Sequence, residues 1–194
     1  PAGAKVGDEV EVFLYRDSSD RLIATTRTPK LIMGQVALLT VVQIGKVGAF
    51  LDWGLEKDLF LPFKQQTRKV KAGDQVLASL YIDKSGRLCA TMNVYEQLRT
   101  DSPYKKDDMV TGRIYEISKN FGAFVAVDDC FSALIPKKEL FGATEPPKIG
   151  ERVTARVVKV LEDGKLTLSI REKAYLQIQK DAEKIEKLLD SYEG

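Results

Sequence analysis

The chain has 194 residues, of which 30 are Lys or Arg and 28 are Asp or Glu, so its formal net charge is only +2. This balance excludes a protein that binds nucleic acid mainly by neutralising many phosphates, so any such contacts must be local and partly stacking. The chain has no histidine, the usual general base and commonest metal ligand. It also has no nucleophile motif and no carboxylates at metal-site spacing, so we expect no catalysis, no metal and no cofactor.

The two cysteines, Cys89 and Cys130, are far apart in the sequence. We expect Cys89 at an outward strand position and Cys130 in a polar turn. Two lone thiols are typical of a reducing compartment. No apolar run reaches the length of a membrane-spanning helix, and no signal peptide is visible. The sequence therefore predicts a cytoplasmic protein that does not bind a membrane.

One pattern occurs three times along the chain, beginning at Lys5, Lys71 and Lys148. Each copy opens with a glycine and an acidic residue, continues as an alternating strand, turns at polar residues and closes with a second strand. A period longer than a solenoid repeat indicates small domains in a row. In the second and third copies the alternation predicts these inward positions: Val76, Ala78, Leu80, Val153, Ala155, Val157, Leu166, Leu168 and Ile170.

The first copy, residues 5–27, consists of the hairpin alone. Its alternation predicts one apolar face, made of Val10, Val12, Leu14, Leu22 and Ala24. The chain starts at Pro1 without a Met. We expect this face to be the inner face of a barrel whose first strands are not in this chain. Because a lone hairpin is marginal in water, it should either pack on the next unit or pair its edge with another chain.

The second and third copies each follow a further shared block. Residues 48–51 match 122–125, and residues 60–62 match 134–136. A segment rich in β-forming residues precedes each block. Each full unit thus contains about five short strands in roughly 65 residues, which is enough for a small closed barrel.

This pattern resembles the S1 RNA-binding domain, a five-stranded OB-fold barrel. The resemblance rests on residues 120–125, 134–140 and 150–171. More narrowly, residues 51–59 and 181–189 are similar to the conserved virulence factor B (YitL-like) family of bacteria. That family places S1 units before a winged-helix domain, which would begin about where this chain stops.

We therefore predict an all-β chain of tandem S1-type OB-fold barrels with a C-terminal helix. A truncated first unit occupies residues 1–30, a second S1 domain 31–100 and a third 101–171. A helix at 172–194 would lead toward the absent winged-helix domain. The helix is predicted from apolar residues spaced three and four apart: Ala174, Ile178, Ala182, Ile185 and Leu189.

An OB barrel binds single strands on the face of its second and third strands. In the third unit Phe121 and Phe124 flank a Gly-Ala pair, and the resemblance implies that such aromatics stack on bases. We expect Phe121 to be an exposed platform at the turn between strands one and two. Alternation leaves open whether Phe124 faces outward or into the core. The cations expected nearby are Arg113, Lys119, Lys138 and Arg171.

The second unit departs from this pattern because Val47 stands in the place of Phe121. Phe50 remains as a stacking candidate, with Lys46 as a nearby cation. Trp53 either exposes its ring in a loop or covers one end of the barrel, and we favour the cover. In both full units a proline stands where S1 domains commonly have a histidine, namely Pro62 and Pro136.

Other cations have two interpretations each. Arg21, Arg87 and Lys165 share one register after the hairpin turn, which indicates either a common RNA-binding role or simple solubility. The basic run at 64–71 either holds phosphates or is a solvated loop.

These features predict a non-catalytic protein that binds single-stranded RNA, or another nucleic acid, by stacking and phosphate contacts. The resemblance implies a bacterial post-transcriptional or gene-expression regulator. The alternative is a protein-interaction scaffold whose barrels have lost the RNA-binding face, which Val47, the missing histidine and the low net charge favour. The oligomeric state stays open.

Overall fold

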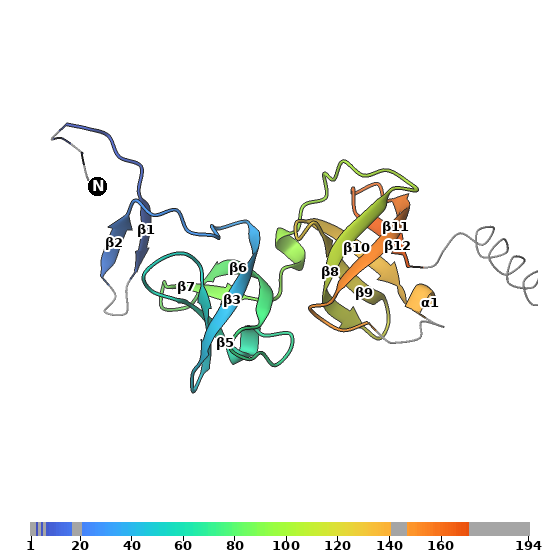
Figure 1. Cartoon of the computed structure of the whole chain (residues 1–194), viewed down its shortest axis with the longest axis horizontal. Helices are drawn as coiled ribbons and strands as arrows, with labels where there is room; N and C mark the ends of the chain where they lie inside the picture. The colour runs from blue at the N-terminus through green and yellow to red at the C-terminus, as the bar shows by residue number, and fades with distance from the viewer. Residues whose placement is uncertain (1–2, 4, 6, 17–20, 141–146, 171–194) are drawn as a thin grey trace, which may run out of the picture.

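The computed structural model describes residues 3, 5, 7–16, 21–140 and 147–170 (Figure 1). A two-stranded hairpin of β1 (Phe13–Arg16) and β2 (Leu22–Thr25) precedes two five-stranded units that follow one another along the chain. The hairpin lies at the first unit, on the side away from the second (Figure 1). The predicted helix at 172–194 lies outside the described residues.

The first barrel has the strand order β5-β4-β3-β6-β7. Its edge strands β5 and β7 lie against each other, so the sheet curls round on itself. The 3₁₀ helix η1 (Phe63–Gln65) follows β5. The strands are β3 (Val36–Ile44), β4 (Gly48–Asp52), β5 (Leu59–Pro62), β6 (Gln75–Ile82) and β7 (Leu88–Thr91).

The second barrel is closed, in the order β10-β12-β11-β8-β9, with β10 and β12 pairing in parallel. A short helix, α1 (Lys137–Leu140), follows β10. The strands are β8 (Met109–Ser118), β9 (Gly122–Val127), β10 (Phe131–Pro136), β11 (Arg152–Val160) and β12 (Leu166–Ser169). Tandem OB-type barrels are thus confirmed as the fold.

Each barrel is filled by the alternating apolar positions expected from the sequence. Seven of the nine predicted inward residues are buried in the two cores, and the other two, Val153 and Ile170, pack against the second core while partly exposed. Burial of these side chains is the main term that stabilises a barrel of this size. The seven are Val76, Ala78, Leu80, Ala155, Val157, Leu166 and Leu168.

The repeated Gly-acidic pair forms the same turn in all three copies. In the second copy the Asp74 carboxylate accepts the backbone N–H of Lys71 at 3.1 Å, and in the third Glu151 accepts that of Lys148 at 2.9 Å. The glycine between them has a positive φ in every copy, for example +88° at Gly73, which a residue with a Cβ adopts only at a cost. The shared motif is therefore a structural requirement of the turn.

A second glycine pair allows two strands to approach closely. Gly48 is paired with Pro62 across β4 and β5, and Gly122 with Pro136 across β9 and β10. A Cβ on Gly122 would lie 2.1 Å from the carbonyl oxygen of Ile135. In both barrels, therefore, the proline at the end of the third strand is paired with a glycine where the two strands approach most closely.

The hairpin packs on the first barrel, which was one of its two expected arrangements. Phe13 and Tyr15 of β1 lie edge-on against the Trp53 ring, with centroid distances of 5.7 and 6.1 Å. Trp53 is only 3% exposed and donates its indole N–H to the Lys57 carbonyl at 2.6 Å. The interpretation of Trp53 as a cover on the barrel is confirmed.

The predicted inner face of the hairpin is not the face that packs on the first barrel. Leu14 and Leu22 are 53% and 65% exposed, and Ala24, Val10 and Val12 are exposed as well. The opposite face, which carries Phe13 and Tyr15, contacts the barrel instead. Phe13 and Tyr15 make edge-on ring contacts with Trp53, and such aromatic pairs stabilise this orientation beyond the apolar area that they bury.

The segment between the barrels packs on both of them. It contains the 3₁₀ helix η2 (Tyr95–Gln97). The backbone of Arg99 pairs with β10, accepting the N–H of Ser132 at 2.8 Å and donating to the carbonyl of Cys130 at 2.9 Å. A small apolar cluster joins the barrels here, made of Leu77, Val94, Leu98, Tyr115 and Ala126.

Candidate nucleic-acid interface

Phe121 and Phe124 lie together on the outside of the second barrel. Phe121, in the turn before β9, is 63% exposed. Phe124 is half-buried, and its neighbours Ala123 and Val125 belong to the core, so alternation turns its ring outward. The two ring centroids are 6.4 Å apart. The structure therefore settles the open orientation of Phe124 in favour of the outer face.

Two tyrosines extend this pair into an aromatic cluster of four residues: Tyr95, Tyr115, Phe121 and Phe124. Tyr95 comes from η2 in the linker and meets the Phe124 ring edge-on at 5.8 Å. Tyr115 lies at a β-bulge in β8, where the register shifts between Ile114 and Glu116. A bulge re-aims a side chain, and here it places Tyr115 beside Phe124 at 6.1 Å.

Tyr115 is the buried member of the aromatic cluster and packs against Phe124. Its side chain is 4% exposed, and its hydroxyl has no hydrogen-bond partner among the described residues. Burial, the largest cause, raises the pKa of this phenol well above its usual range. Tyr115 thus packs Phe124 in place, whereas Phe121 and Tyr95 offer exposed ring area.

The cluster opens onto a pocket of about 610 Å³ over the outer face of β9 and β10. Leu134 of β10 lies directly across the ladder from Phe124 and lines the same pocket. The turn between β11 and β12 forms the far wall with Leu161, Asp163 and Lys165. This is the strand pair and the loop that frame single-strand binding in OB folds.

The pocket has little net positive charge. The Lys165 ammonium lies 5.3 Å from the centre of the Tyr95 ring and 2.8 Å from the Asp163 carboxylate. The hydrogen bond with Asp163 raises the pKa of Lys165, and the same contact lowers that of Asp163. Glu116 lines the pocket as well. Aromatic faces and hydrogen-bonding groups therefore dominate over free cations.

The first barrel has a smaller pocket of about 370 Å³ at the corresponding place. Phe50 and Phe60 lie across β4 and β5 with ring centroids 5.5 Å apart. Val47, 67% exposed, leaves the Phe121 position without a ring. The hairpin residues Tyr15 and Arg16 line this pocket too, so part of its wall comes from outside the barrel.

Arg87 and Lys165, predicted from a shared register, line the two corresponding pockets. Arg21, in the same register of the first copy, is exposed on the hairpin. Lys46 and Lys119 are exposed in the turns before β4 and β9, and Lys138 is exposed in α1. Arg171 lies outside the described residues.

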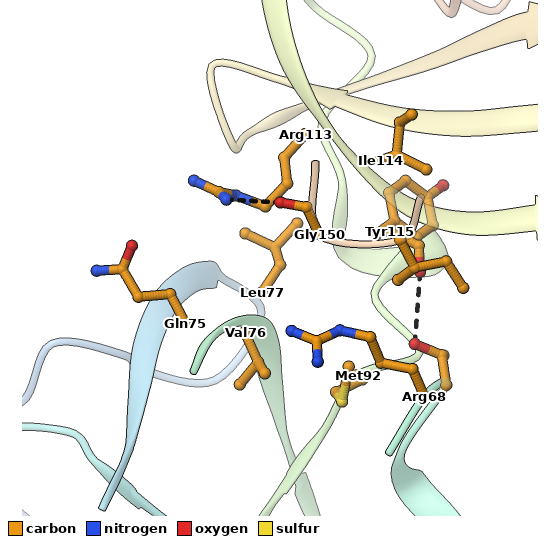
Figure 2. Close-up of a pocket in the computed structure, with 11 residues that line it drawn as sticks. Arg68, Gln75, Val76, Leu77, Met92, Arg113, Ile114, Tyr115 and Gly150 are labelled. Carbon is orange, nitrogen blue, oxygen red and sulfur yellow. Dashed lines mark hydrogen bonds between the residues drawn. The ribbon is translucent and has the colours of Figure 1, made fainter. Parts of the chain in front are cut away.

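The structure corrects the expected position of Arg113. Its side chain is buried, and it donates to the Asp129 carboxylate in the turn between β9 and β10 at 3.0 Å. It also donates to the Gly150 carbonyl in the turn before β11 at 3.1 Å (Figure 2). Alternation does place Arg113 outside the core, but its surroundings are covered by the turn at Gly150. A buried, paired guanidinium is retained for structure and is not a free phosphate ligand.

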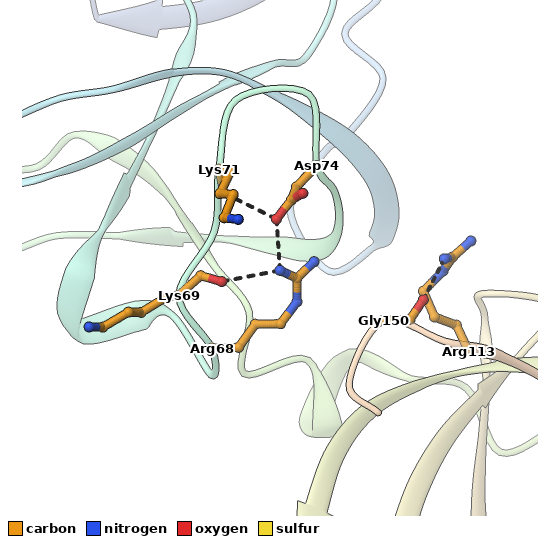
Figure 3. Close-up of polar contacts among 6 residues, drawn as sticks. All are labelled: Arg68, Lys69, Lys71, Asp74, Arg113 and Gly150. Atoms are coloured by element: carbon orange, nitrogen blue, oxygen red, sulfur yellow. Dashed lines mark hydrogen bonds and ion pairs between the residues drawn. The ribbon is translucent and has the colours of Figure 1, made fainter. Parts of the chain in front are cut away.

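Arg68 of the basic run is also engaged, at the boundary between the barrels. It donates to the Asp74 carboxylate at 2.8 Å and to the Lys69 carbonyl at 3.2 Å, opposite Gly150 and Arg113 (Figure 3). Arg68 thus fits neither interpretation of the run: it stabilises the turn before β6. The hydroxyl of Thr67 donates to the Tyr115 carbonyl at 3.4 Å, which links the run to the second barrel.

Among the pocket residues that sequence reasoning missed are Phe60, Tyr95 and Glu116. Phe60 could have been found, because Leu59 and Leu61 are core residues and alternation turns Phe60 outward. Glu116 could have been found in the same way, once the β-bulge was located. Tyr95 carries no local signal, since only the path of the linker brings it to Phe124.

The cysteines are both free thiols, and Cys130 lies in the predicted turn. Cys89 points away from the first core, as expected, but it is buried. No group of acidic or cysteine side chains able to hold a metal occurs within the described ranges. In the part of the chain that the structure covers, no helix is long and apolar enough to cross a bilayer.

Comparison with known proteins identifies two domains. The S1 domain family matches residues 1–27 and 33–93, and the second domain of the virulence regulatory factor CvfB matches 95–172. Among relatives, the uncharacterized protein YitL of Bacillus subtilis is 34% identical over 91% of this chain and 61% of its own length. Conserved virulence factor B of Staphylococcus saprophyticus is 26% identical over 98% of this chain and 65% of its own.

The chain thus spans 61% to 65% of the length of these relatives. A crystal structure of a Streptococcus pneumoniae multidomain protein with nucleic acid binding domains aligns with 98% of this chain and 70% of its own. Its TM-score is 0.57 at 24% identity, which supports the fold. The predicted resemblance to S1 repeats and to the virulence factor B family is confirmed.

Proposed function

Because the chain is built from an S1 domain and a second domain of the virulence regulatory factor CvfB type, we propose that it binds single-stranded RNA and catalyses no reaction. The binding surface is the pocket beside the aromatic cluster of the second barrel. Bases would stack on Phe121 and Phe124, while Lys165 and Lys119 would lie near the backbone phosphates.

The observation that carries this proposal is the exposed ring of Phe121 beside Phe124 at the mouth of the pocket. An exposed phenylalanine costs solvation free energy unless a partner covers it, and every nucleobase has a flat face that fits. The ring lies in the turn that leads into the strand pair with which OB folds hold single strands. Few cations are free nearby, so stacking has to supply most of the affinity.

The first barrel would bind more weakly. It has Phe50, Phe60 and Arg87 in its pocket, but Val47 in place of a ring. We propose that it adds contacts to a strand already held by the second barrel. Two linked weak sites raise affinity through their effective concentration.

The biological role would be regulation of gene expression in a bacterial cytoplasm. The names of the relatives, conserved virulence factor B and virulence regulatory factor CvfB, support a regulatory role. A reducing cytoplasm also suits the free thiols of Cys89 and Cys130.

The test is fluorescence anisotropy with labelled single-stranded RNA, comparing wild type with Phe121→Ala. Loss of one stacked base should weaken binding by about 1–3 kcal/mol. Val47→Ala is the matched control, since it removes an equally exposed apolar side chain at the same position of the first barrel. It should change the affinity little.

Thermal melting separates binding from folding. Because Phe121 is 63% exposed, its removal should leave the melting temperature nearly unchanged. A large drop in melting temperature with unchanged affinity would show that the ring is structural. Absence of RNA binding by the wild type would favour the alternative of a protein-interaction scaffold.

A further inference from the structure

We propose that Glu116 gives the pocket of the second barrel a preference for guanine. This inference rests on the proposed RNA-binding function and names the base that the same site selects. It follows from the placement of one carboxylate beside a stacking ring.

Glu116 and Phe124 face each other across the β8–β9 ladder, and both line the pocket. Directly opposed residues of an antiparallel pair project from the same face with their Cβ atoms about 5 Å apart. A base that stacks on Phe124 therefore has an edge within reach of the Glu116 carboxylate. The pocket volume of about 610 Å³ leaves room for such a base.

The carboxylate is available to a ligand. Among the described residues, no hydrogen bond and no ion pair engages the Glu116 carboxylate, whereas Asp163 on the opposite wall is paired with Lys165 at 2.8 Å. A free negative charge repels backbone phosphates, so it favours a strand orientation with a base edge toward it. Hydrogen bonds to a charged acceptor are stronger than neutral ones.

The four bases differ in what they offer a carboxylate. Guanine presents two adjacent donors, N1–H and the N2 amine, which match the two carboxylate oxygens. Adenine and cytosine present an amine next to a ring nitrogen that accepts, and uracil presents one N–H between two carbonyls. Only guanine can bind in the bidentate way without an acceptor facing the negative charge.

The first barrel lacks this feature. Gln43 faces Phe50 across the β3–β4 ladder at the position that corresponds to Glu116. A neutral amide both donates and accepts, so it has no comparable preference for a donor pair. The two barrels would thus differ in selectivity as well as in strength.

Competition binding with 10-nucleotide RNAs tests the inference. The probes are an all-uridine strand and strands in which one central uridine is replaced by guanosine, adenosine, cytidine or inosine. One guanosine avoids the four-stranded assemblies that guanosine-rich strands form. The wild type should prefer the guanosine strand over the all-uridine strand by about tenfold, the usual effect of a hydrogen bond to a charged group.

Inosine keeps N1–H but lacks the N2 amine, so its affinity should lie between those of the uridine and guanosine strands. Glu116→Gln, which copies the first barrel, should remove the preference without weakening binding of the all-uridine strand. Glu162→Gln is the matched control, because Glu162 is exposed in the β11–β12 turn and does not line the pocket. It should keep the preference.

The outcomes separate this inference from the proposed function. If the wild type binds none of the RNA probes, the proposed RNA-binding function is contradicted. A wild type that binds all strands equally, or a Glu116→Gln variant that still prefers guanosine, overturns the role of Glu116 and leaves RNA binding intact. Melting temperatures of both variants confirm that folding is unchanged.

Discussion

Tyr95 of the linker and Phe124 of β9 pack edge to face, with ring centroids 5.8 Å apart and ring planes at 87°. The contact is possible because Val94 and Leu98, on either side of η2, are buried between the barrels. The linker is therefore part of the candidate binding surface, and a separated second barrel that began after it would lack one aromatic ring.

Replacing Tyr95 by Ala should weaken RNA binding by about 1–3 kcal/mol, because the pocket loses a ring that can stack on a base. Tyr95→Phe should bind nearly as well as wild type, since the ring itself remains under Lys165. Anisotropy titrations of both variants check this. Equal losses in the two would mean that the hydroxyl, and not the ring, contributes the affinity.

The dependence of binding on salt should be shallow. Two of the expected cations are already paired with carboxylates: Lys165, at the pocket, with Asp163, and Arg113, away from it, with Asp129. We expect two to four neutralised phosphates, which corresponds to a log–log slope of about −1.5 to −3 for single strands. Titrations at several salt concentrations measure it, and a slope steeper than about −5 would contradict binding led by stacking.

Much of this fold could be predicted because the signals are local. The positive φ of Gly73 and Gly150 is needed within each turn, and the core positions of β6, β11 and β12 follow from alternation along a single strand. Repetition of these signals three times along the chain also fixed the number of units. No knowledge of distant contacts was necessary.

The differences from expectation concern residues whose environment comes from another part of the chain. Alternation in the hairpin defines two faces, but Trp53 of the first barrel decides that Phe13 is on the buried one. Arg113 points out of its own barrel, yet the turn at Gly150 covers it. Tyr95 joins the site only because the linker passes over the second barrel.

Gly122 should be among the most sensitive positions for stability. An alanine there meets the Ile135 carbonyl oxygen at 2.1 Å and adopts an unfavourable φ of +125°. Overpacking costs about 1–3 kcal/mol and the backbone strain about 1–2 kcal/mol more. Urea unfolding should therefore show Gly122→Ala destabilised by about 2–5 kcal/mol.

Gly86 provides the control for this prediction. Its φ is +79°, but nothing lies within 4 Å of a Cβ built on it. Gly86→Ala should thus cost only the backbone strain of about 1–2 kcal/mol. Equal losses for the two variants would show that β9 and β10 can move apart to admit a methyl group.

The thiol of Cys89 should be unreactive in the folded protein. It is 3% exposed, and burial, assisted by the charge of Asp83, raises its pKa to about 11. The thiolate is the reactive form, so at pH 8 Cys89 is almost entirely in the inert thiol form. Iodoacetamide labelling followed by peptide mass spectrometry should therefore modify Cys130, which is partly exposed, long before Cys89.

The Cys130→Ser variant isolates this effect. Its single remaining thiol should label slowly at pH 8 and faster as the pH rises toward 11, because the raised pKa delays deprotonation. Addition of urea should restore ordinary reactivity at pH 8, since unfolding exposes the thiol to water. Rapid labelling of Cys89 at pH 8 without urea would contradict this prediction and show that the β6–β7 hairpin opens readily.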